Sequence, residues 1–177
     1  FDAKRAFFNS RGLGNYSRDT IRILTQVESE NRYFLYSPKK EQKIGFAYNR
    51  DNSEVRTPEG WHSISSALWR TRFVCEDIRR DQLDIYHGLS HELPYGIEKT
   101  GVRSVVTMHD LIFLKNPELF PFFDRYTFKK KYTHGCRIAD RVIAISEETK
   151  SDLINYLGEQ EERIDVVYQG CNPIFHQ

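Results

Sequence analysis

The sequence lacks any long hydrophobic run, and this excludes one class of protein at once. Its longest apolar stretches, such as 105–108 and 142–145, are far shorter than the roughly 20 residues that span a bilayer. No positively charged start leads into an apolar stretch with a small-residue cleavage site, which is the pattern of a signal peptide. We therefore expect a protein that does not cross a membrane and that is located in the cytoplasm.

Cysteine is scarce, and neither sign of charge prevails. Cys75, Cys136 and Cys171 are odd in number and widely separated, which argues against a disulfide framework and against a C-x-x-C site. Lys and Arg number 26 against 25 Asp and Glu, so no overall field attracts the chain to nucleic acid. We expect no nucleic-acid partner, and any contact with an anionic membrane has to be local.

The length and the hydrophobic content of the chain are those of one folded domain. The 177 residues are 39% hydrophobic and 14% aromatic, enough for a core within the usual domain size of ~100–200 residues. Four Val- and Ile-rich runs, separated mostly by helical patterns, predict parallel strands that are covered on both faces. They are 83–88, 103–110, 140–146 and 163–170. The sequence thus predicts an α/β fold with a doubly wound, mostly parallel sheet flanked by helices, which is Rossmann-like.

The remaining elements are predicted from shorter patterns. Two aromatic and aliphatic runs, 32–37 and 43–48, are strand candidates, and the polar stretch 49–60 reads as a loop. Helices are expected over 16–27, over 61–80 and from Ser146, an N-cap, to Gly158, a stop signal. Because the chain opens on Phe1 without a methionine, we expect that its beginning is missing and that a first strand is shortened.

Candidate ligand-binding residues lie at the predicted carboxyl ends of the strands, where open α/β sheets bind ligands. These are His87, His109, Asp110 and Ser146. The stretch "RGLGNYSRDT" adds Gly12 and Gly14 between an apolar start and a helix, which predicts either a sharp turn or a loop whose amides approach a ligand. Because several polar groups are expected to converge on one crevice, the interpretation as a ligand-binding loop is favoured.

Most familiar site motifs are missing. The third glycine of G-x-G-x-x-G is replaced by Ser17, which disfavours NAD, and no P-loop or G-x-S-x-G nucleophile elbow is present. His87 and His91 are four residues apart but lie in a predicted loop without a third ligand, so no metal is expected. His109 is either a core-edge or capping residue, or a neutral imidazole that donates to a sugar hydroxyl or phosphate oxygen, oriented by Asp110.

The segment "FPFFDRYTFKKKY" (120–132) mixes aromatic residues with Arg125 and three lysines. Such a segment is either a surface helix that rests on an anionic membrane or a packed helix with a solvated basic face. The packed helix is the preferred interpretation, and peripheral contact with the inner face of a membrane is the alternative.

Four segments, in order along the chain, resemble the N-terminal domain of family-4 retaining glycosyltransferases, which pair two Rossmann-like domains in the GT-B architecture. "FDAKRAFFNSRGLGNYSRDTI" is similar to the family's opening strand and Gly-rich loop, and "VVTMHDLIFLKNPELF" to its His-Asp strand end. "ADRVIAISEETKSDLINYLG" is similar to its I-x-x-S-E-x-x-K segment, and "IDVVYQGCNPIF" to the turn before the interdomain linker. The resemblance covers about half of the chain.

The resemblance implies that residues 1–177 are the acceptor-side domain of a hexosyltransferase, with mannose and glucose as the candidate sugars. A nucleotide sugar would be held mainly by a C-terminal domain that has no counterpart in these residues, and a saccharide or lipid-linked saccharide by this one. Gly12, Leu13 and Gly14 match the loop near the donor diphosphate, and His109 matches the histidine that faces the transferred sugar. Weaker candidates for the cleft are Tyr16, Arg18, His87, Asp110 and Ser146.

The implied reaction needs no cofactor and no metal, only the nucleotide-sugar donor. The alternative from another class is a stand-alone, non-catalytic module that binds a phosphosugar or a partner segment in the same crevice. The region that follows residue 175 in the parent gene would discriminate between the two.

Overall fold

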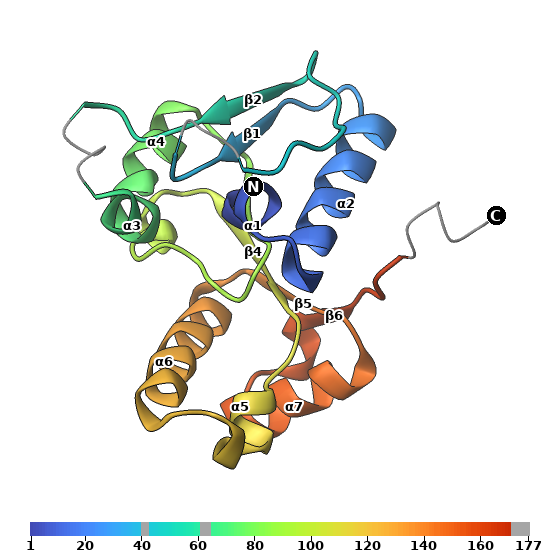
Figure 1. Ribbon diagram of the computed structural model, residues 1–177, viewed down its shortest axis with the longest axis vertical. Helices are drawn as coiled ribbons and strands as arrows, with labels where there is room; N and C mark the ends of the chain where they lie inside the picture. Colours follow the sequence, from blue (N-terminus) through green and yellow to red (C-terminus); the bar gives the residue numbers. More distant parts are fainter. Residues whose placement is uncertain (40–42, 61–64, 171–177) are drawn as a thin grey trace.

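The computed structural model describes residues 1–39, 43–60 and 65–170, and these form an α/β domain with parallel strands (Figure 1). The first half contains α1 (Lys4–Phe8), α2 (Gly12–Val27), β1 (Tyr33–Tyr36), β2 (Ser53–Arg56), α3 (Ser66–Leu68), the π-helical turn η2 (Trp69–Phe73) and α4 (Val74–Arg80). The second half contains β3 (Ile85–Gly88), η3 (Ile97–Lys99), β4 (Arg103–Met108), α5 (Ile112–Lys115), η4 (Pro117–Leu119), α6 (Phe122–Ile138), β5 (Arg141–Ala144), α7 (Glu147–Leu157), η5 (Glu161–Arg163) and β6 (Ile164–Val166).

The amino-terminal residues join two groups of parallel strands. β1 pairs with β2, and the other group has the order β3-β4-β5-β6. Asp2 forms a parallel bridge to Tyr36 of β1, and its amide donates to the carbonyl oxygen of His87 in β3 (3.0 Å). Residues 1–3 thus occupy the position of the first strand, between β1 and β3. The resulting order, with the first strand in the middle, is that of a doubly wound Rossmann-type sheet.

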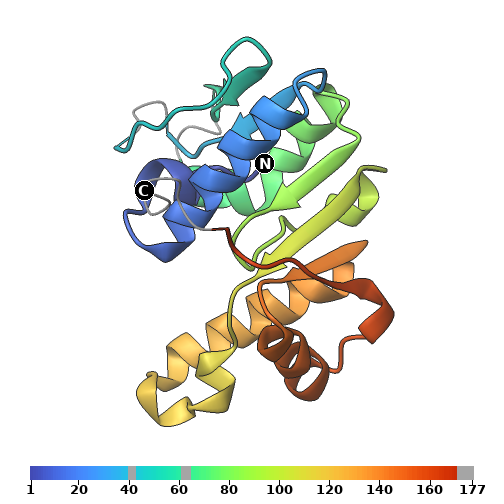
Figure 2. The ribbon, with the colours of Figure 1, turned by 90° about the vertical axis from the view of Figure 1, so that its right-hand side faces the viewer.

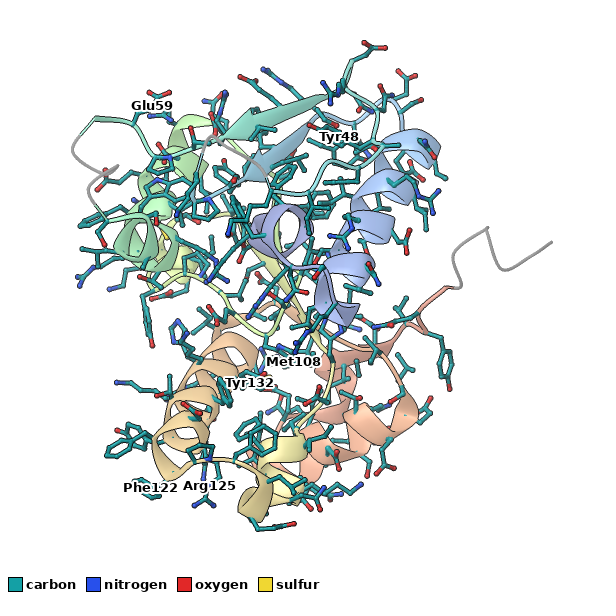
Figure 3. All side chains as sticks on the ribbon, viewed as in Figure 1. Tyr48, Glu59, Met108, Phe122, Arg125 and Tyr132 are labelled. Atoms are coloured by element: carbon teal, nitrogen blue, oxygen red, sulfur yellow. The ribbon has the colours of Figure 1, made fainter. Side chains whose placement is uncertain are left out.

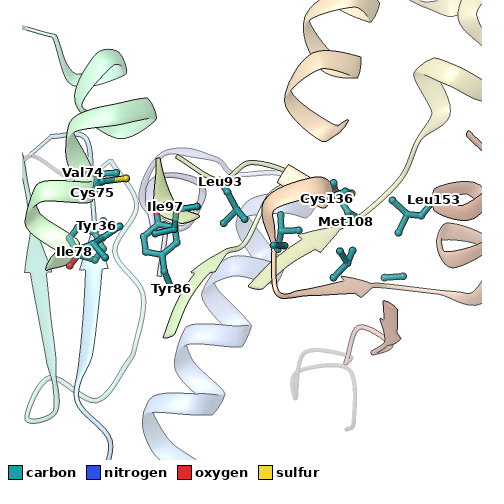
Figure 4. Packing of buried hydrophobic residues seen from close by; sticks show 14 of the residues in the cluster. Tyr36, Val74, Cys75, Ile78, Tyr86, Leu93, Ile97, Met108, Cys136 and Leu153 are labelled. Carbon is teal, nitrogen blue, oxygen red and sulfur yellow. The ribbon is translucent and has the colours of Figure 1, made fainter. Parts of the chain in front are cut away.

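Helices cover both faces of this sheet. Figures 1 and 2 place α6 and α7 on one side of β4 and β5, and α2 on the other. Figure 4 shows how one core extends through the domain, from Tyr36 and Ile78 near β1 to Met108 and Leu153 near α7. A second, smaller cluster includes Phe7 and Ile21, which hold α1 against α2. The predicted fold class is therefore confirmed.

The predicted strand over 32–37 is confirmed as β1, but one predicted strand and one predicted loop in the first half are wrong. Residues 43–48 form no strand, because Phe46 packs against Phe7 (5.5 Å between ring centroids) and against Tyr48 (5.0 Å). The second strand is β2, inside the stretch predicted as a loop. It is a half-buried edge strand without an apolar run, so its pairing with β1 and not its composition defines it.

The predicted helix over 61–80 is only partly reproduced. Residues 61–64 lie outside the described residues, and the rest is interrupted by η2 before α4. The boundaries of α7, in contrast, match the prediction. The Ser146 hydroxyl accepts a hydrogen bond from the Thr149 amide (3.1 Å), and Gly158 ends the helix in the left-handed conformation with φ +68°.

A buried ion pair holds the first strand in place. The Arg70 side chain, only 10% exposed, lies 2.7 Å from a carboxylate oxygen of Asp2 and 2.7 Å from one of Glu92. Glu92 also accepts from Lys131 of α6 (3.2 Å). Burial opposes ionisation, but the charges of Arg70 and Lys131 lower the pKa of Glu92 to about 2. The network links residue 2, η2, the loop after β3 and α6.

Within the described residues, no helix has the length and apolar character that a bilayer crossing requires.

Candidate functional site

Polar side chains gather where β3 and β4 end, beside the point at which the strand order reverses. His87 lies in β3, Thr107 lies near the end of β4, and His109 follows β4 directly. Ligands of open α/β sheets bind outside the carboxyl ends of the strands at such a switch point. The topology therefore places these residues at the edge where the sequence predicts a site.

Thr107 links two of the predicted site residues. Its buried hydroxyl lies 3.1 Å from the Tyr16 hydroxyl of α2 and 2.8 Å from Nε2 of His87. Burial lowers the pKa of His87 to about 3, so its imidazole is neutral near pH 7. The chain Tyr16–Thr107–His87 connects α2 to β3 and β4 and holds both side chains in one geometry.

The His109 ring is held by two hydrogen bonds that determine its tautomer. Its Nε2–H donates to the carbonyl oxygen of Leu89 (3.0 Å), which accepts only, and its Nδ1 accepts from the side-chain amide of Gln169 (3.2 Å). Burial lowers the pKa of His109, which keeps the ring neutral. Nδ1 therefore offers a lone pair, and the predicted role as a donor to a sugar hydroxyl or phosphate oxygen is wrong for this tautomer.

Two further aromatic rings surround His109. The Tyr16 ring meets it edge to face at 4.6 Å between centroids, and His91 lies 5.0 Å away. His91 has the left-handed φ of +64°, and its Nε2 accepts from the His109 amide (3.1 Å). Such a conformation is strained for a non-glycine residue and is common at functional sites. His91 and His87 are thus occupied by protein partners, and the described residues contain no metal-binding group of three His, Cys, Asp or Glu.

Asp110 and Ser146 lie at the same edge but act locally. Asp110 is exposed, and its Oδ1 accepts from the Ile112 amide at the start of α5 (3.4 Å). Leu89 and Gln169, and not Asp110 as predicted, orient the His109 ring. The Ser146 hydroxyl caps α7. Thr149, the residue that this cap binds, donates to the His109 carbonyl oxygen (3.0 Å), so Ser146 reaches His109 only through Thr149.

The two glycines are not in a loop, which corrects the sequence interpretation. Gly12 and Gly14 both belong to α2. A Cβ on Gly14 would lie 1.7 Å from the backbone oxygen of Asn9, whereas a Cβ on Gly12 would meet nothing within 4 Å. Gly14 is therefore required by the close approach of α2 to the chain after α1, and only the exposed Gly12 remains open toward a ligand.

The neighbouring candidates also have structural partners. One Nη of Arg18 donates to the backbone oxygens of Ala6 (2.9 Å) and Asn9 (2.8 Å), so Arg18 holds the end of α1. The Leu13 carbonyl oxygen accepts from the Ser17 hydroxyl (2.7 Å). These contacts account for both residues without a ligand.

A groove of about 1010 Å³ runs along α2 beside this cluster. Four predicted site residues line it, namely Gly12, Tyr16, Arg18 and His87. Its other wall is the segment 167–170, which includes Tyr168 and Gln169. His109 lies behind Tyr16 and Gln169, whereas Leu13, Gly14, Asp110 and Ser146 are not part of the lining.

Sequence reasoning missed three residues of this region. Thr107 was identifiable as the hydroxyl that interrupts the apolar residues 105–108, but Gln169 had no signal, because its partner is 60 residues away. Arg5 is the third. Its Nε is buried without a hydrogen-bond partner among the described residues. Burial lowers the pKa of His91 and His109, and the positive charge of Arg5 adds to this, so the guanidinium lies near the cluster.

Fold and site together define a Rossmann-like domain with a groove at the switch point, one neutral histidine on the groove wall and a second behind it. The model of the family described as Glycosyltransferase Family 4 matches residues 11–174. Because the match covers nearly the whole chain, the chain belongs to this family, and the resemblance to the N-terminal domain of these enzymes is confirmed. No curated protein matches the sequence. The protein is thus a glycosyltransferase domain, the Rossmann-like half of a GT-B architecture.

Proposed function

We propose that this domain is the acceptor-side half of a retaining glycosyltransferase, which transfers a hexose from a nucleotide sugar to a saccharide or a lipid-linked saccharide. The observation that carries the proposal is the groove of about 1010 Å³ at the switch point, with Tyr16 and His87 on its wall and the His109 ring behind it. Family membership supports sugar transfer, and the size and position of the groove support a bound saccharide.

Each residue then has a role that follows from its hydrogen bonds. The Nδ1 lone pair of His109 accepts a hydroxyl of the transferred sugar once Gln169 gives way, and the tautomer is maintained by Leu89. The Gly12 end of α2 approaches the donor diphosphate, because Arg11, its N-cap, gives the helix no side-chain hydrogen bond and the helix dipole favours an anion there. The donor itself is held mainly by a second domain.

The test uses the full-length protein that contains this chain, incubated with a panel of nucleotide sugars and saccharide acceptors and analysed by mass spectrometry. His109→Ala should lower turnover on the order of 10²–10³, the usual loss for a preorganised polar contact to a reacting group. Its matched control is Thr149→Val, which removes a hydrogen bond to the His109 backbone but leaves the ring in place.

The two variants separate chemistry from folding, because both weaken the same strand end. Equal losses of turnover at equal losses of melting temperature would refute a role of the ring in transfer. A wild-type protein that binds sugar phosphates but transfers no sugar from any donor would instead support the non-catalytic binding module.

A further inference from the structure

The outward side of α6 carries aromatic side chains that the fold does not use. Phe122, Phe123 and Tyr126 are 67%, 81% and 63% exposed, respectively. At 100° per residue they share a sector of about 120° with four polar residues farther along the helix. We call this set the α6 outer face; it consists of Phe122, Phe123, Tyr126, Lys129, Lys130, Thr133 and Arg137.

The packing of α6 is provided by other residues. Phe128 and Tyr132 contact Phe113 of α5, with ring centroids 5.7 Å and 5.0 Å away. Figure 3 shows Tyr132 turned toward the body of the protein, whereas Phe122 and Arg125 extend from the beginning of the helix into the surroundings. The predicted packed helix with a solvated basic face is therefore confirmed, and the exposed aromatic residues share that solvated face.

The charge of the α6 outer face is of one sign. Within the described ranges, Lys129, Lys130 and Arg137 form no ion pair, whereas Lys131 on another side of the helix binds Glu92. Asp124 is the only carboxylate in α6, and its position in the helix places it on the opposite side. A hollow of about 430 Å³ lies along this face, between Tyr126, the two lysines, His134 and Arg137.

The α6 outer face is distinct from the groove. The groove follows α2 and residues 167–170, and Figures 1 and 2 both show α2 and α6 on opposite sides of β4. α6 begins, however, at the edge where β4 ends, because it runs back toward the start of β5. A surface bound to Phe122 and Phe123 would therefore lie next to the edge that carries His109.

We propose that the α6 outer face docks the protein on a bilayer that contains anionic phospholipid. Aromatic side chains at one end of a helix insert at the boundary between headgroups and acyl chains, and lysine and arginine bind the headgroup phosphates. Here the three aromatic residues form the inserting end, and Lys129, Lys130 and Arg137 with their hollow form the cationic part. Charge complementarity selects an anionic lipid surface over a second copy of this chain, which would meet cations with cations.

The experiment measures cosedimentation with vesicles of equal parts phosphatidylglycerol and phosphatidylcholine, compared with phosphatidylcholine alone. The wild type should bind the anionic vesicles, and less so as salt is raised. Phe122→Ser with Phe123→Ser should weaken binding about tenfold or more. Lys129→Gln with Lys130→Gln should weaken it about fivefold for each charge and reduce its salt dependence.

The matched control removes the same charge elsewhere. The control is the double variant Arg32→Gln, Arg50→Gln. Both residues are exposed and lie near β1 and β2, far from α6, so this variant should bind vesicles like the wild type. Absence of binding to anionic vesicles overturns the proposal, and so does an equal loss in the control. A phenylalanine variant that changes the oligomeric state but keeps vesicle binding would show a protein contact instead.

A second measurement covers the case in which the serine variant does not fold. Phe123→Trp preserves an exposed aromatic side chain, and its fluorescence should shift to shorter wavelength and be quenched by brominated lipid on anionic vesicles. Unchanged emission at saturating lipid would refute insertion. Because neither assay contains a sugar donor, their failure is distinct from failure of the proposed transfer reaction.

Discussion

Replacing Gly14 by alanine tests whether this glycine serves the helix contact or a ligand. The new Cβ would lie 1.7 Å from Asn9 O and 3.0 Å from the Arg18 guanidinium, so α2 and the chain after α1 have to separate. Overpacking of this kind costs about 1–3 kcal/mol. The separation also strains the hydrogen bonds from Arg18 to Ala6 and Asn9, each charge-assisted and worth about 1.5–3 kcal/mol.

Together these effects predict a destabilisation of about 4 kcal/mol, allowing for partial relaxation. For a protein of this size, that corresponds to a melting temperature about 8–16 °C lower. Thermal unfolding followed by circular dichroism measures it. Gly12→Ala is the control, because nothing lies within 4 Å of its new Cβ and alanine restricts the unfolded chain; we expect an unchanged or slightly higher melting temperature.

The reasoning is refuted if Gly14→Ala melts within about 2 °C of the wild type, well below the decrease of about 8–16 °C that the combined effects predict. A variant with wild-type stability and weakened nucleotide-sugar binding would restore the sequence interpretation, in which Gly14 faces the ligand.

Three further predictions concern the hydrogen-bonded residues at the groove, His87 and Thr107, and the activity of residues 1–177 in the absence of a second domain. Burial lowers the pKa of His87 to about 3, whereas an unfolded histidine has a pKa of roughly 6.5. As the pH is lowered from about 6.5 toward 3, the unfolded chain binds the proton and the folded chain does not, so the free energy of unfolding decreases. Urea unfolding at pH 5.5 should show a loss of about 1.4 kcal/mol from this residue, absent in His87→Gln. Thr107→Val should cost about 1–3 kcal/mol in the same assay, since it leaves Tyr16 and His87 without their shared partner, whereas Thr107→Ser should cost less; equal costs would contradict this network. Residues 1–177 alone should transfer no sugar, and measurable transfer would contradict a donor site in a second domain.

Local signals predicted those parts of the fold that depend on neighbouring residues. The runs that became β3 to β6 were visible because buried parallel strands are almost continuously apolar. Both boundaries of α7 followed from the side chain of Ser146 and the backbone freedom of Gly158. β2 was missed because an edge strand without an apolar run is defined by its partner, and the aromatic residues of 43–48 proved to pack on α1.

The candidate site was predicted in position but not in chemistry. His87 and His109 were identified as strand-end residues, yet their hydrogen-bond partners come from elsewhere in the chain, and those partners determine which nitrogen carries the proton. Gly14 was assigned to a ligand because the sharp reversal between α1 and α2, which brings Asn9 against it, was predicted as a loop and not as the start of a helix.

The central position of residues 1–3 in the sheet affects how the chain folds during its synthesis. A strand in the middle of a sheet needs neighbours on both sides, and here those neighbours are Tyr36 of β1 and His87 of β3. During synthesis Tyr36 emerges early, but His87 emerges only after all of residues 4–86. Contacts so distant in sequence form slowly, because the entropy of closing a long loop is lost before the contacts contribute any stabilising free energy. Until β3 has been synthesised, the side of residues 1–3 that pairs with β3 therefore has no partner strand. During that time the incomplete sheet is exposed to pairing with other chains.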